Sequence, residues 1–378
     1  MVQGFVPMTI LWVVLGAVAS GILTGAVRTY AIGKSVLDIP NHRSSHTVPT
    51  PRGGGVAIAV VVLAGTVLGW AADAVPRDFA VALIGGGAAV ALTGWLDDRF
   101  RLSAAVRAAV HLVAAGWVIL RLGGLPELDL GVTRVPLGAF GTVVGMLGAA
   151  WMINLYNFMD GIDGLAAGEG VLVGIIGGVL LTMSGEPGLA LVALLTAAAC
   201  AGFLWWNWHP ARIFMGDVGS GFLGIVFATL AVASENRSAV PLLLWVVLLG
   251  VFIFDATVTL VRRVLRRERW YEAHRSHAYQ RAVQAGRSHH VVTAGALGVG
   301  LLLGIGVWVA HLWRDSIPIV VLACLSLLTW IYFRIEKARP MEPEPSGSPS
   351  AVEQGVDSGL VGTPADRSRA SRHHITRY

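Results

Sequence analysis

The chain has 378 residues, of which 55% are hydrophobic and only 13% are charged, and its mean hydropathy is +0.67. Soluble domains carry about a quarter charged residues, so this composition excludes an ordinary soluble protein and indicates one surrounded mostly by lipid. The net charge is a modest +5, and no stretch interleaves aromatic and basic residues in the way that would bind nucleic acid.

Apolar runs of about 20 residues, the length that crosses roughly 30 Å of hydrocarbon, recur along the chain. They predict an all-α, polytopic membrane protein with about eleven transmembrane helices. The expected spans lie near residues 8–30, 54–72, 79–96, 104–122, 139–154, 168–184, 188–206, 219–235, 240–260, 291–312 and 317–334. The first run lacks a basic leader and a small-residue cleavage site, so we interpret it as a retained helix and not as a signal peptide.

Lysines and arginines are shared unequally between the predicted loops. The loops near 31–53, 97–103, 207–218 and 261–290 hold most of them. The opposite loops hold one each, namely Arg77, Arg134, Arg237 and Arg314. The positive-inside rule therefore predicts a multi-pass protein of the inner (plasma) membrane, with the N-terminus outside and the C-terminus in the cytoplasm.

The composition changes near Glu336, where the chain becomes polar and rich in Pro, Ser and Gly. We therefore expect a transmembrane domain over residues 1–335 and a disordered cytoplasmic tail over residues 336–378. The tail contains His373 and His374, but a solvated pair without further ligands is not expected to bind a metal. Cys200 and Cys324 both fall inside predicted spans, so no disulfide is expected.

The dense polar stretches all fall on the predicted cytoplasmic side. They are DIPNHRSSHTVPTPRGGG (38–55), GWLDDRFRLS (94–103), NLYNFMDGIDGL (154–165), NWHPARIFMGDVGSG (207–221) and RERWYEAHRSHAYQR (267–281). This asymmetry favours an enzyme with a polar cytoplasmic substrate. A membrane transporter, the alternative of another class, needs polar groups near the bilayer midplane and on both faces.

Carboxylates are concentrated in these loops, as Asp97, Asp98, Asp160, Asp163 and Asp217. Packed together they would raise one another's pKa unless a cation or basic groups stood among them, and a divalent metal is the simplest answer. Aspartate and asparagine oxygens suit Mg²⁺, with Mn²⁺ as an alternative, and no Cys or His cage is evident to favour zinc. Basic residues that can contact phosphate lie on the same face: Arg107, His274, Arg275, His277 and Arg281.

Two of these features also have simpler structural interpretations. The pair Asp97 and Asp98 can cap the end of a helix without any catalytic role. Asp255, inside the apolar stretch FIFDATVTL, is expected to pair with Arg262 or Arg263 and to orient its helix.

In combination, however, the motifs resemble a known family. An Asp-Asp pair at the cytoplasmic end of an early helix is followed by Asn-x-x-Asn-x-x-Asp-Gly-x-Asp-Gly-Leu, then by FMGDVGS and a His-rich basic loop. This order is similar to that of the polyprenyl-phosphate N-acetylhexosamine-1-phosphate transferases, glycosyltransferase family 4, which include the MraY translocase and the WecA type. The resemblance covers about residues 30–290.

The resemblance implies roles for residues that bind the metal and the nucleotide sugar. Asp217 matches the metal-ligand aspartate of the family, and Asn157 matches a second contact to the metal or the diphosphate. Further contacts to the UDP-N-acetylhexosamine are expected from Asn154, Asp160, Asp163 and Arg107.

It also implies catalytic roles. Asp97 and Asp98 match the aspartate pair of which one is expected to deprotonate the lipid phosphate or to act as a nucleophile. The residues expected to grip the diphosphate are His274, Arg275 and His277.

Two departures from the translocase pattern bear on the substrate. The basic loop reads His-Arg-Ser-His and not three adjacent histidines, and Arg99 follows the Asp-Asp pair in place of a lysine. Both favour the WecA/WbpL-type branch, which initiates surface-polysaccharide (O-antigen-like) synthesis. That branch transfers an N-acetylhexosamine-1-phosphate from a UDP-sugar to undecaprenyl phosphate and releases UMP. A phospho-N-acetylmuramoyl-pentapeptide transferase is the nearest alternative enzyme, and a homodimer is one option for its assembly.

Overall fold

Helices make up most of the described chain. The computed structural model describes residues 2–40, 48–269 and 274–342. The helices are α1 (Val2–Gly33), α2 (Val56–Ala71), α3 (Arg77–Phe100), α4 (Ala104–Arg121), α5 (Gly138–Met159), α6 (Leu165–Met183), α7 (Pro187–Asn207), α8 (Asp217–Asn236), α9 (Leu242–Leu248), α10 (Gly250–Leu265), α11 (Ala278–Gln284), α12 (His289–Leu312) and α13 (Ile317–Ala338), with a 3₁₀ turn at Arg314–Ser316. Two small antiparallel sheets pair β1 (Leu37–Asp38) with β2 (Thr50–Pro51) and β3 (Glu127–Asp129) with β4 (Arg134–Pro136).

Nine helices within the described ranges are long and apolar enough to cross a membrane, namely α1, α3 to α8, α12 and α13. The prediction of an all-α, polytopic membrane protein is therefore confirmed. Two of the expected spans do not form such helices. One is α2, whose 16 residues measure roughly 24 Å at about 1.5 Å per residue, less than the roughly 30 Å of a hydrocarbon core.

The other is the span expected at 240–260, which is broken into two helices. The chain forms α9 and α10, which meet at an angle of 80°. The buried face of α10 carries two ionisable side chains, Asp255 and Arg263, while Val261, Val264 and Leu265 are exposed. Burying charges in hydrocarbon is costly, so the bend is favourable because it carries this polar face to the loops described below.

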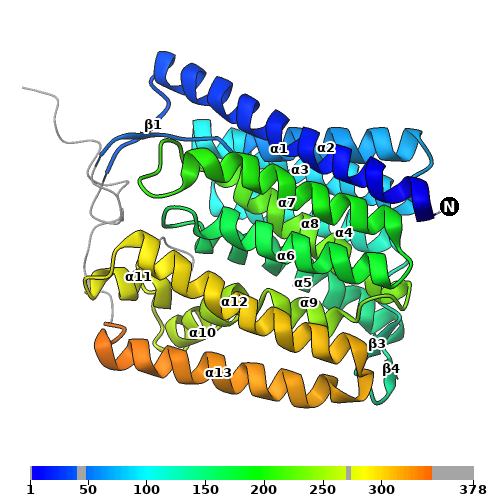
Figure 1. Ribbon diagram of the computed structural model, residues 1–378. Helices are drawn as coiled ribbons and strands as arrows, with labels where there is room; N and C mark the ends of the chain where they lie inside the picture. Colours follow the sequence, from blue (N-terminus) through cyan, green and yellow to red (C-terminus); the bar gives the residue numbers. More distant parts are fainter. Residues whose placement is uncertain (1, 41–47, 270–273, 343–378) are drawn as a thin grey trace, which may run out of the picture. The chain divides into compact units, whose positions relative to one another are not determined.

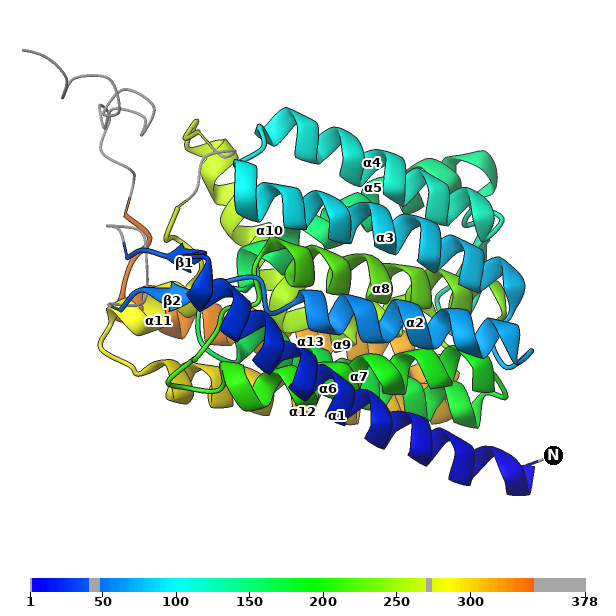
Figure 2. The same cartoon turned by 90° about the horizontal axis from the view of Figure 1, so that it is seen from above.

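The polar loops gather at one end of the helices. In Figure 1, β1 and α11 mark this end, and the N-terminus and the β3–β4 sheet mark the opposite end. The most enclosed helix is α8, in which every residue from Val218 to Glu235 is buried. It packs against α3 and α5, and Figure 2 shows it beside α3. The N-terminus of α8 and the C-terminus of α3 therefore meet at the polar end.

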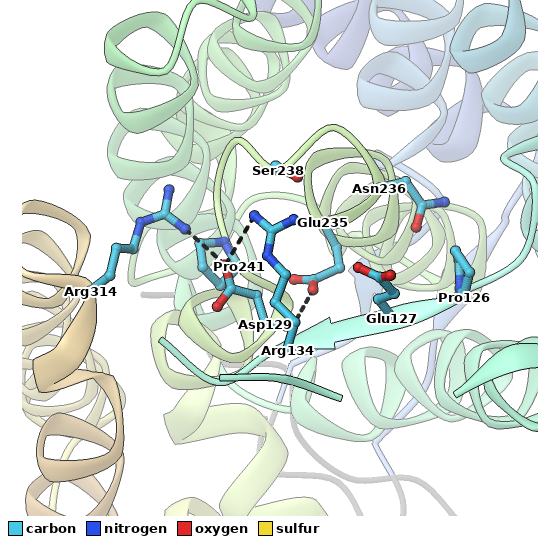
Figure 3. Close-up of a pocket in the computed structure, with 9 residues that line it drawn as sticks. All are labelled: Pro126, Glu127, Asp129, Arg134, Glu235, Asn236, Ser238, Pro241 and Arg314. Carbon is cyan, nitrogen blue, oxygen red and sulfur yellow. Dashed lines mark hydrogen bonds and ion pairs between the residues drawn. The ribbon is translucent and has the colours of Figure 1, made fainter. Parts of the chain in front are cut away.

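The opposite end is closed by a compact polar network (Figure 3). Glu235 accepts hydrogen bonds from the backbone N–H groups of Asp129, at 2.6 Å, and Leu242, at 2.5 Å. Arg314 donates to the Ala239 carbonyl at 2.6 Å and lies 3.5 Å from Asp129. The cavity between them holds only about 60 Å³, well below the roughly 300 Å³ at which ligand pockets begin. We interpret this network as a structural closure of the helix ends.

The boundary expected between residues 335 and 336 falls inside α13. Glu336 forms a two-pronged ion pair with Arg262, at 2.6 and 2.9 Å, and also pairs with Arg281. These contacts hold α13 against α10 and α11, and the helix continues to Ala338. Residues 343–378, which hold both histidines of the expected tail, lie outside the described residues.

Candidate active site

Arg52 joins two helices at the polar end. Its Nε lies 2.8 Å from Asp98 Oδ1, and its Nη2 lies 2.6 Å from Asp217 Oδ1. Asp98 belongs to the last turn of α3, and Asp217 is the first residue of α8. Burial disfavours the charged guanidinium, but the carboxylates of Asp217 and Asp98 outweigh burial and raise the pKa of Arg52 above its ordinary value.

A second arginine makes a similar bridge. Arg107 Nη1, from α4, lies 2.7 Å from Asp97 Oδ2 and 3.7 Å from Asp217 Oδ2. The other oxygen of Asp97 accepts a hydrogen bond at 2.6 Å from the N–H of Leu102, just beyond the end of α3. Asp97 therefore serves the helix end, as the simpler interpretation proposed, and also belongs to the charged cluster.

Glycines make this close approach of α3 and α8 feasible. Gly216 adopts a φ of +76°, and a Cβ there would lie 2.5 Å from Asp98 Oδ2. A Cβ at Gly94 of α3 would lie 2.5 Å from the Asp217 carbonyl oxygen. Because glycine lacks this atom, the N–H of Asp217 can donate a hydrogen bond to Asp98 Oδ1 at 3.2 Å.

Backbone hydrogen bonds place Arg52 in the site. The N–H of Phe214 donates to the Pro51 carbonyl at 2.8 Å, and the N–H groups of Gly53 and Gly54 donate to the Phe214 carbonyl at 3.1 and 2.9 Å. The segment before α2 is thus attached to the segment that leads into Asp217. Sequence reasoning did not select Arg52, although its position before three consecutive glycines was a usable signal.

The donor set at this cluster fits a hard divalent cation. Asp97, Asp98, Asp160 and Asp217 bring four carboxylates against the two guanidiniums of Arg52 and Arg107, which leaves a deficit of two positive charges if all are ionised. Asp98 Oδ2 is buried and has no hydrogen-bond partner among the described residues. Mg²⁺ prefers oxygen ligands of this kind.

The predicted residue Asp160 belongs to this cluster, and the predicted residue Asn157 borders it. Burial, with the charges of Asp217 and Asp98, raises the pKa of Asp160 well above its ordinary value, and a cation beside it would reverse this effect. Asn157 lies beside Asp217, and its amide donates to the Ser220 hydroxyl at 3.2 Å.

Asn154 and Asp163 make other contacts. The Asn154 amide donates to the Ala150 carbonyl at 2.7 Å and lies 3.3 Å from His111 Nδ1 on α4. The Asp163 carboxylate faces His209 and His289, two residues that sequence reasoning did not place in the site. Burial alone would raise the pKa of Asp163, but His289 and His209 outweigh burial and hold it below its ordinary value.

Asp255 anchors the basic loop, and the expectation that it pairs with Arg262 or Arg263 is wrong. Its carboxylate accepts hydrogen bonds from the N–H groups of Ala278, at 2.8 Å, and Tyr279, at 3.1 Å, and lies 3.6 Å from His277 Nδ1. The first N–H groups of a helix have no intrahelical partner, so the start of α11 attracts the carboxylate. The two arginines pair instead with acidic residues, Glu336 and Glu268.

The basic loop lies against the end of α5. The His277 ring stacks on Phe158 with centroids 6.2 Å apart, and the Tyr279 hydroxyl donates to the Phe158 carbonyl at 3.0 Å. This contact brings His277 close to the segment that carries Asn157 and Asp160.

Other basic residues of this loop are partly or wholly enclosed. The His274 ring centroid lies 4.9 Å from that of His277, and Arg275 is half-buried beside them. Burial, followed by the charges of His277 and Arg263, lowers the pKa of His274 to about 3. The expected phosphate contact of Arg281 is wrong, because its guanidinium is buried and pairs with Glu336.

With this geometry established, comparison with known proteins decides the family. Residues 80–235 match the model of glycosyl transferase family 4. The chain is 32% identical over 316 residues to the "Probable undecaprenyl-phosphate N-acetylglucosaminyl 1-phosphate transferase" of Bacillus subtilis (strain 168), covering 80% of this chain and 85% of that protein. The chain belongs to glycosyl transferase family 4. The resemblance inferred from its motifs is therefore confirmed.

Other relatives of this family 4 protein carry two different names. The decaprenyl-phosphate N-acetylglucosaminephosphotransferase of Mycobacterium leprae (strain TN) is 31% identical over 322 residues, which cover 76% of this chain and 80% of the relative. The phospho-N-acetylmuramoyl-pentapeptide-transferase of Mycobacterium sp. (strain JLS) is 33% identical over 314 residues, which cover 68% of this chain and 85% of the relative. All four clustered aspartates lie within the family match, whereas Arg52 and the basic loop lie outside it.

Proposed function

We propose that this family 4 protein transfers an N-acetylhexosamine-1-phosphate from a UDP-sugar to undecaprenyl phosphate, releases UMP and so initiates a cell-envelope polysaccharide. Two relatives that align with 80% and 76% of this chain are named for transfer of N-acetylglucosamine phosphate to polyprenyl phosphates. The observation that carries the proposal is the aspartate cluster bridged by Arg52 and Arg107. Such a cluster suits a reaction in which a diphosphate must be neutralised and aligned.

Asp217 is the proposed Mg²⁺ ligand, with Asn157 as a second contact and Mn²⁺ as an alternative ion. When bound, the ion would neutralise charge on the diphosphate of the UDP-sugar and on the departing UMP. The proposal is supported by the oxygen-only donor set and by the excess of carboxylate over guanidinium.

The reaction exchanges one phosphoanhydride bond for another. An oxygen of the lipid phosphate attacks the phosphorus that bears the sugar. The bond from that phosphorus to the bridging oxygen of the diphosphate breaks, and the bridging oxygen leaves as part of UMP. Asp98 is the proposed proton acceptor, since its buried Oδ2 has no hydrogen-bond partner among the described residues. A modest base suffices, because the second pKa of a phosphate monoester is about 6.

Arginines and the basic loop have the complementary role. Arg52 and Arg107 fix the directions of Asp98, Asp97 and Asp217 and compensate their charge. His274, Arg275 and His277 are the proposed contacts to the diphosphate. His274, with its pKa of about 3, is neutral at physiological pH and can act as a hydrogen-bond donor but not as a charge.

An apolar pocket offers a place for the lipid chain. It lies between α10, α12 and α13, holds about 350 Å³, and is lined by side chains that include Phe254, Val292, Val299, Leu328 and Ile331. Asp255 and Tyr279 line the same pocket, so it reaches the anchored start of the basic loop. We assign the isoprenoid units nearest the phosphate to this pocket.

The muramoyl-pentapeptide transferase is the alternative enzyme, because relatives with that name also match, although they cover less of this chain than the two N-acetylglucosamine relatives do. The transporter alternative loses its main candidate. A transporter needs acidic residues near the midplane, for which Asp255, inside an apolar stretch, is a partial candidate. Its carboxylate instead accepts hydrogen bonds from the backbone at the start of α11. The active face is proposed to be cytoplasmic, in the inner membrane, where UDP-sugars are available.

A direct assay distinguishes the two enzymes. Purified protein is mixed with undecaprenyl phosphate and Mg²⁺, and with either UDP-N-acetylglucosamine, another UDP-N-acetylhexosamine or UDP-N-acetylmuramoyl-pentapeptide. The lipid product is identified by its mass, and UMP is measured in parallel. A product only with the pentapeptide substrate would replace the proposal by the alternative, and no UMP with any donor would refute both.

A further inference from the structure

Three side chains from separate segments meet beside the α5–α6 connection. His209 Nδ1, from the segment between α7 and α8, lies 2.6 Å from Asp163 Oδ2. His289 Nδ1, from the first residue of α12, lies 3.4 Å from Asp163 Oδ1. One potential ligand atom from each of these residues falls within 4.8 Å of the other two. Sequence analysis did not predict this cluster, because its residues are 46 or more positions apart.

One atom of the cluster is left without a hydrogen bond. His289 Nδ1 is buried and makes no hydrogen bond within the described residues, although it faces the Asp163 carboxylate. Its contact with Asp163 is an ion pair at 3.4 Å, which requires a protonated ring. With a neutral ring, a cation held between the carboxylate and the two imidazoles would give this buried nitrogen a partner.

The surroundings hold the three side chains in place. The N–H of Ala211 donates to Asp163 Oδ2 at 3.1 Å, and the Thr293 hydroxyl donates to the Asp163 carbonyl at 2.8 Å. The His209 ring is stacked with that of His290, with centroids 6.1 Å apart and an angle of 28° between the planes. Outer contacts of this kind orient the ligands of metal sites.

We propose that Asp163, His209 and His289 form a binding site for a divalent transition metal, best suited to Zn²⁺ and separate from the oxygen site at Asp217. Two imidazoles and one carboxylate are ligands that zinc accepts, whereas Mg²⁺ prefers oxygen alone. Binding at roughly 2.0–2.2 Å requires the three side chains to adjust around the ion, and water completes the coordination. The partly exposed His209 gives the ion access from solution.

The site would have a consequence for the aspartate cluster. His209 lies eight positions before Asp217 in the same connecting segment, and that segment also contacts Pro51 and Gly53 beside Arg52. An ion that ties His209 to Asp163 and to α12 would therefore stabilise the segment that delivers Asp217. This proposal does not depend on which sugar the enzyme transfers.

The test uses full-length protein without a histidine tag, in which His373 and His374 are replaced by Ala to remove the tail pair. After chelator treatment, Co²⁺ is titrated in the presence of excess Mg²⁺, and its visible absorption reports coordination by nitrogen. We expect one Co²⁺ per chain, displaced by Zn²⁺. His209→Ala and His289→Ala should each weaken binding more than about tenfold. The control is His311→Ala, in the last turn of α12 beside Ser184, which should bind as the parent does.

A second readout covers variants that fold poorly. Excess Zn²⁺ should raise the unfolding temperature of the parent and of His311→Ala, but not that of Asp163→Asn or His209→Gln. The proposal is overturned if Co²⁺ produces no spectrum, or if His209→Ala and His289→Ala bind it like the parent. It is also overturned if Asp217→Asn alone removes the signal, since the ion would then sit among the aspartates. None of these outcomes depends on transferase activity, so the proposed function is tested separately.

Discussion

Arg52 Nη2 lies 2.6 Å from Asp217 Oδ1, although the two residues are 165 positions apart in the chain. The same guanidinium also contacts Asp98, so a single side chain fixes the distance between the ends of α3 and α8. Arg52→Ala should lower the transferase rate by about 100-fold, the scale seen when one charge-stabilising donor is removed from an active site. Arg52→Lys should recover only part of it, because lysine cannot make two directed contacts.

Arg99→Ala is the control for Arg52. Arg99 adjoins Asp98 in sequence, but its guanidinium lies 4.4 Å from the Trp95 ring centroid and donates to the Tyr30 hydroxyl. Its loss should change the rate less than about twofold, as for a surface cation outside the site. Equal rates for Arg52→Ala and Arg99→Ala in the UMP assay would remove Arg52 from the active site.

Asp217→Asn tests the proposed magnesium site. The change removes one carboxylate from the cluster while keeping the shape of the side chain, so activity should fall to background at ordinary Mg²⁺ while the helices stay intact. A chelator should likewise stop the wild type, and Mg²⁺ or Mn²⁺ should restore it. Asp78→Asn, at an exposed ion pair with Arg237, is the matched control and should behave as wild type. Full activity in excess chelator would contradict the metal proposal.

The sequence predicted those parts of the site that are written as compact motifs. Asp97, Asp98 and Asp217 were selected from short polar stretches, and the structure brings them together. Arg52 was missed because its role depends on a backbone attachment to Phe214. The three glycines after Arg52 indicate a close backbone approach but do not identify Phe214 as its partner. The partner of Asp255 was wrong for a related reason, since the unpaired N–H groups at a helix start have no residue type of their own.

The fold was predictable to a similar degree. Hydropathy located every long helix, because each apolar run must bury its own backbone hydrogen bonds. It could not detect the 80° bend between α9 and α10, since an apolar run gives the same signal whether or not it is straight. The bend depends on where the charged face of α10 finds partners, which is a tertiary property.

Topology is tested by single cysteines in a background with Cys200 and Cys324 replaced by Ser. Ala285→Cys lies at the exposed end of α11, with the polar loops, and Asp315→Cys lies exposed in the 3₁₀ turn at the opposite end. If the positive-inside rule holds, an impermeant thiol reagent should label Asp315→Cys in intact cells and Ala285→Cys only after the inner face is opened. The reverse pattern would place the aspartate cluster on the outer face and exclude a UDP-sugar as its substrate.

The low pKa of His274 predicts a pH effect on stability. An exposed histidine in the unfolded chain has a pKa of about 6.5, whereas that of the folded residue is about 3. Between these values only the unfolded state binds the proton, so stability falls as the pH falls through this window. In thermal unfolding, His274→Gln should therefore lose less stability than wild type between pH 8 and pH 5. The control His290→Gln should lose as much stability as wild type over the same range. Parallel curves for His274→Gln and wild type would contradict the assigned pKa.

Asp255 should act as a positioning residue for His277. Asn in its place would turn an amide N–H₂ or a single carbonyl toward the N–H groups of Ala278 and Tyr279, so the start of α11 and the His277 ring should lose their fixed orientation. His277 is a proposed contact to the diphosphate, and loss of one donor that stabilises charge in the transition state costs about 10² to 10³ in rate. Because Asp255→Asn would only misplace the His277 ring, we expect it to lower kcat at least about tenfold.

The KM for the UDP-sugar separates this role from a general loss of structure. It should change less than about threefold if Asp255 orients a group that acts in the transition state. Thr259→Val is the matched control and should retain kcat. Thr259 donates to Asp255 Oδ1 at 3.1 Å, and this hydrogen bond lies within α10. If KM rose while kcat stayed unchanged, the whole fall in kcat/KM would come from weaker substrate binding. Asp255 would then serve binding, and His277 would have no role in the chemical step.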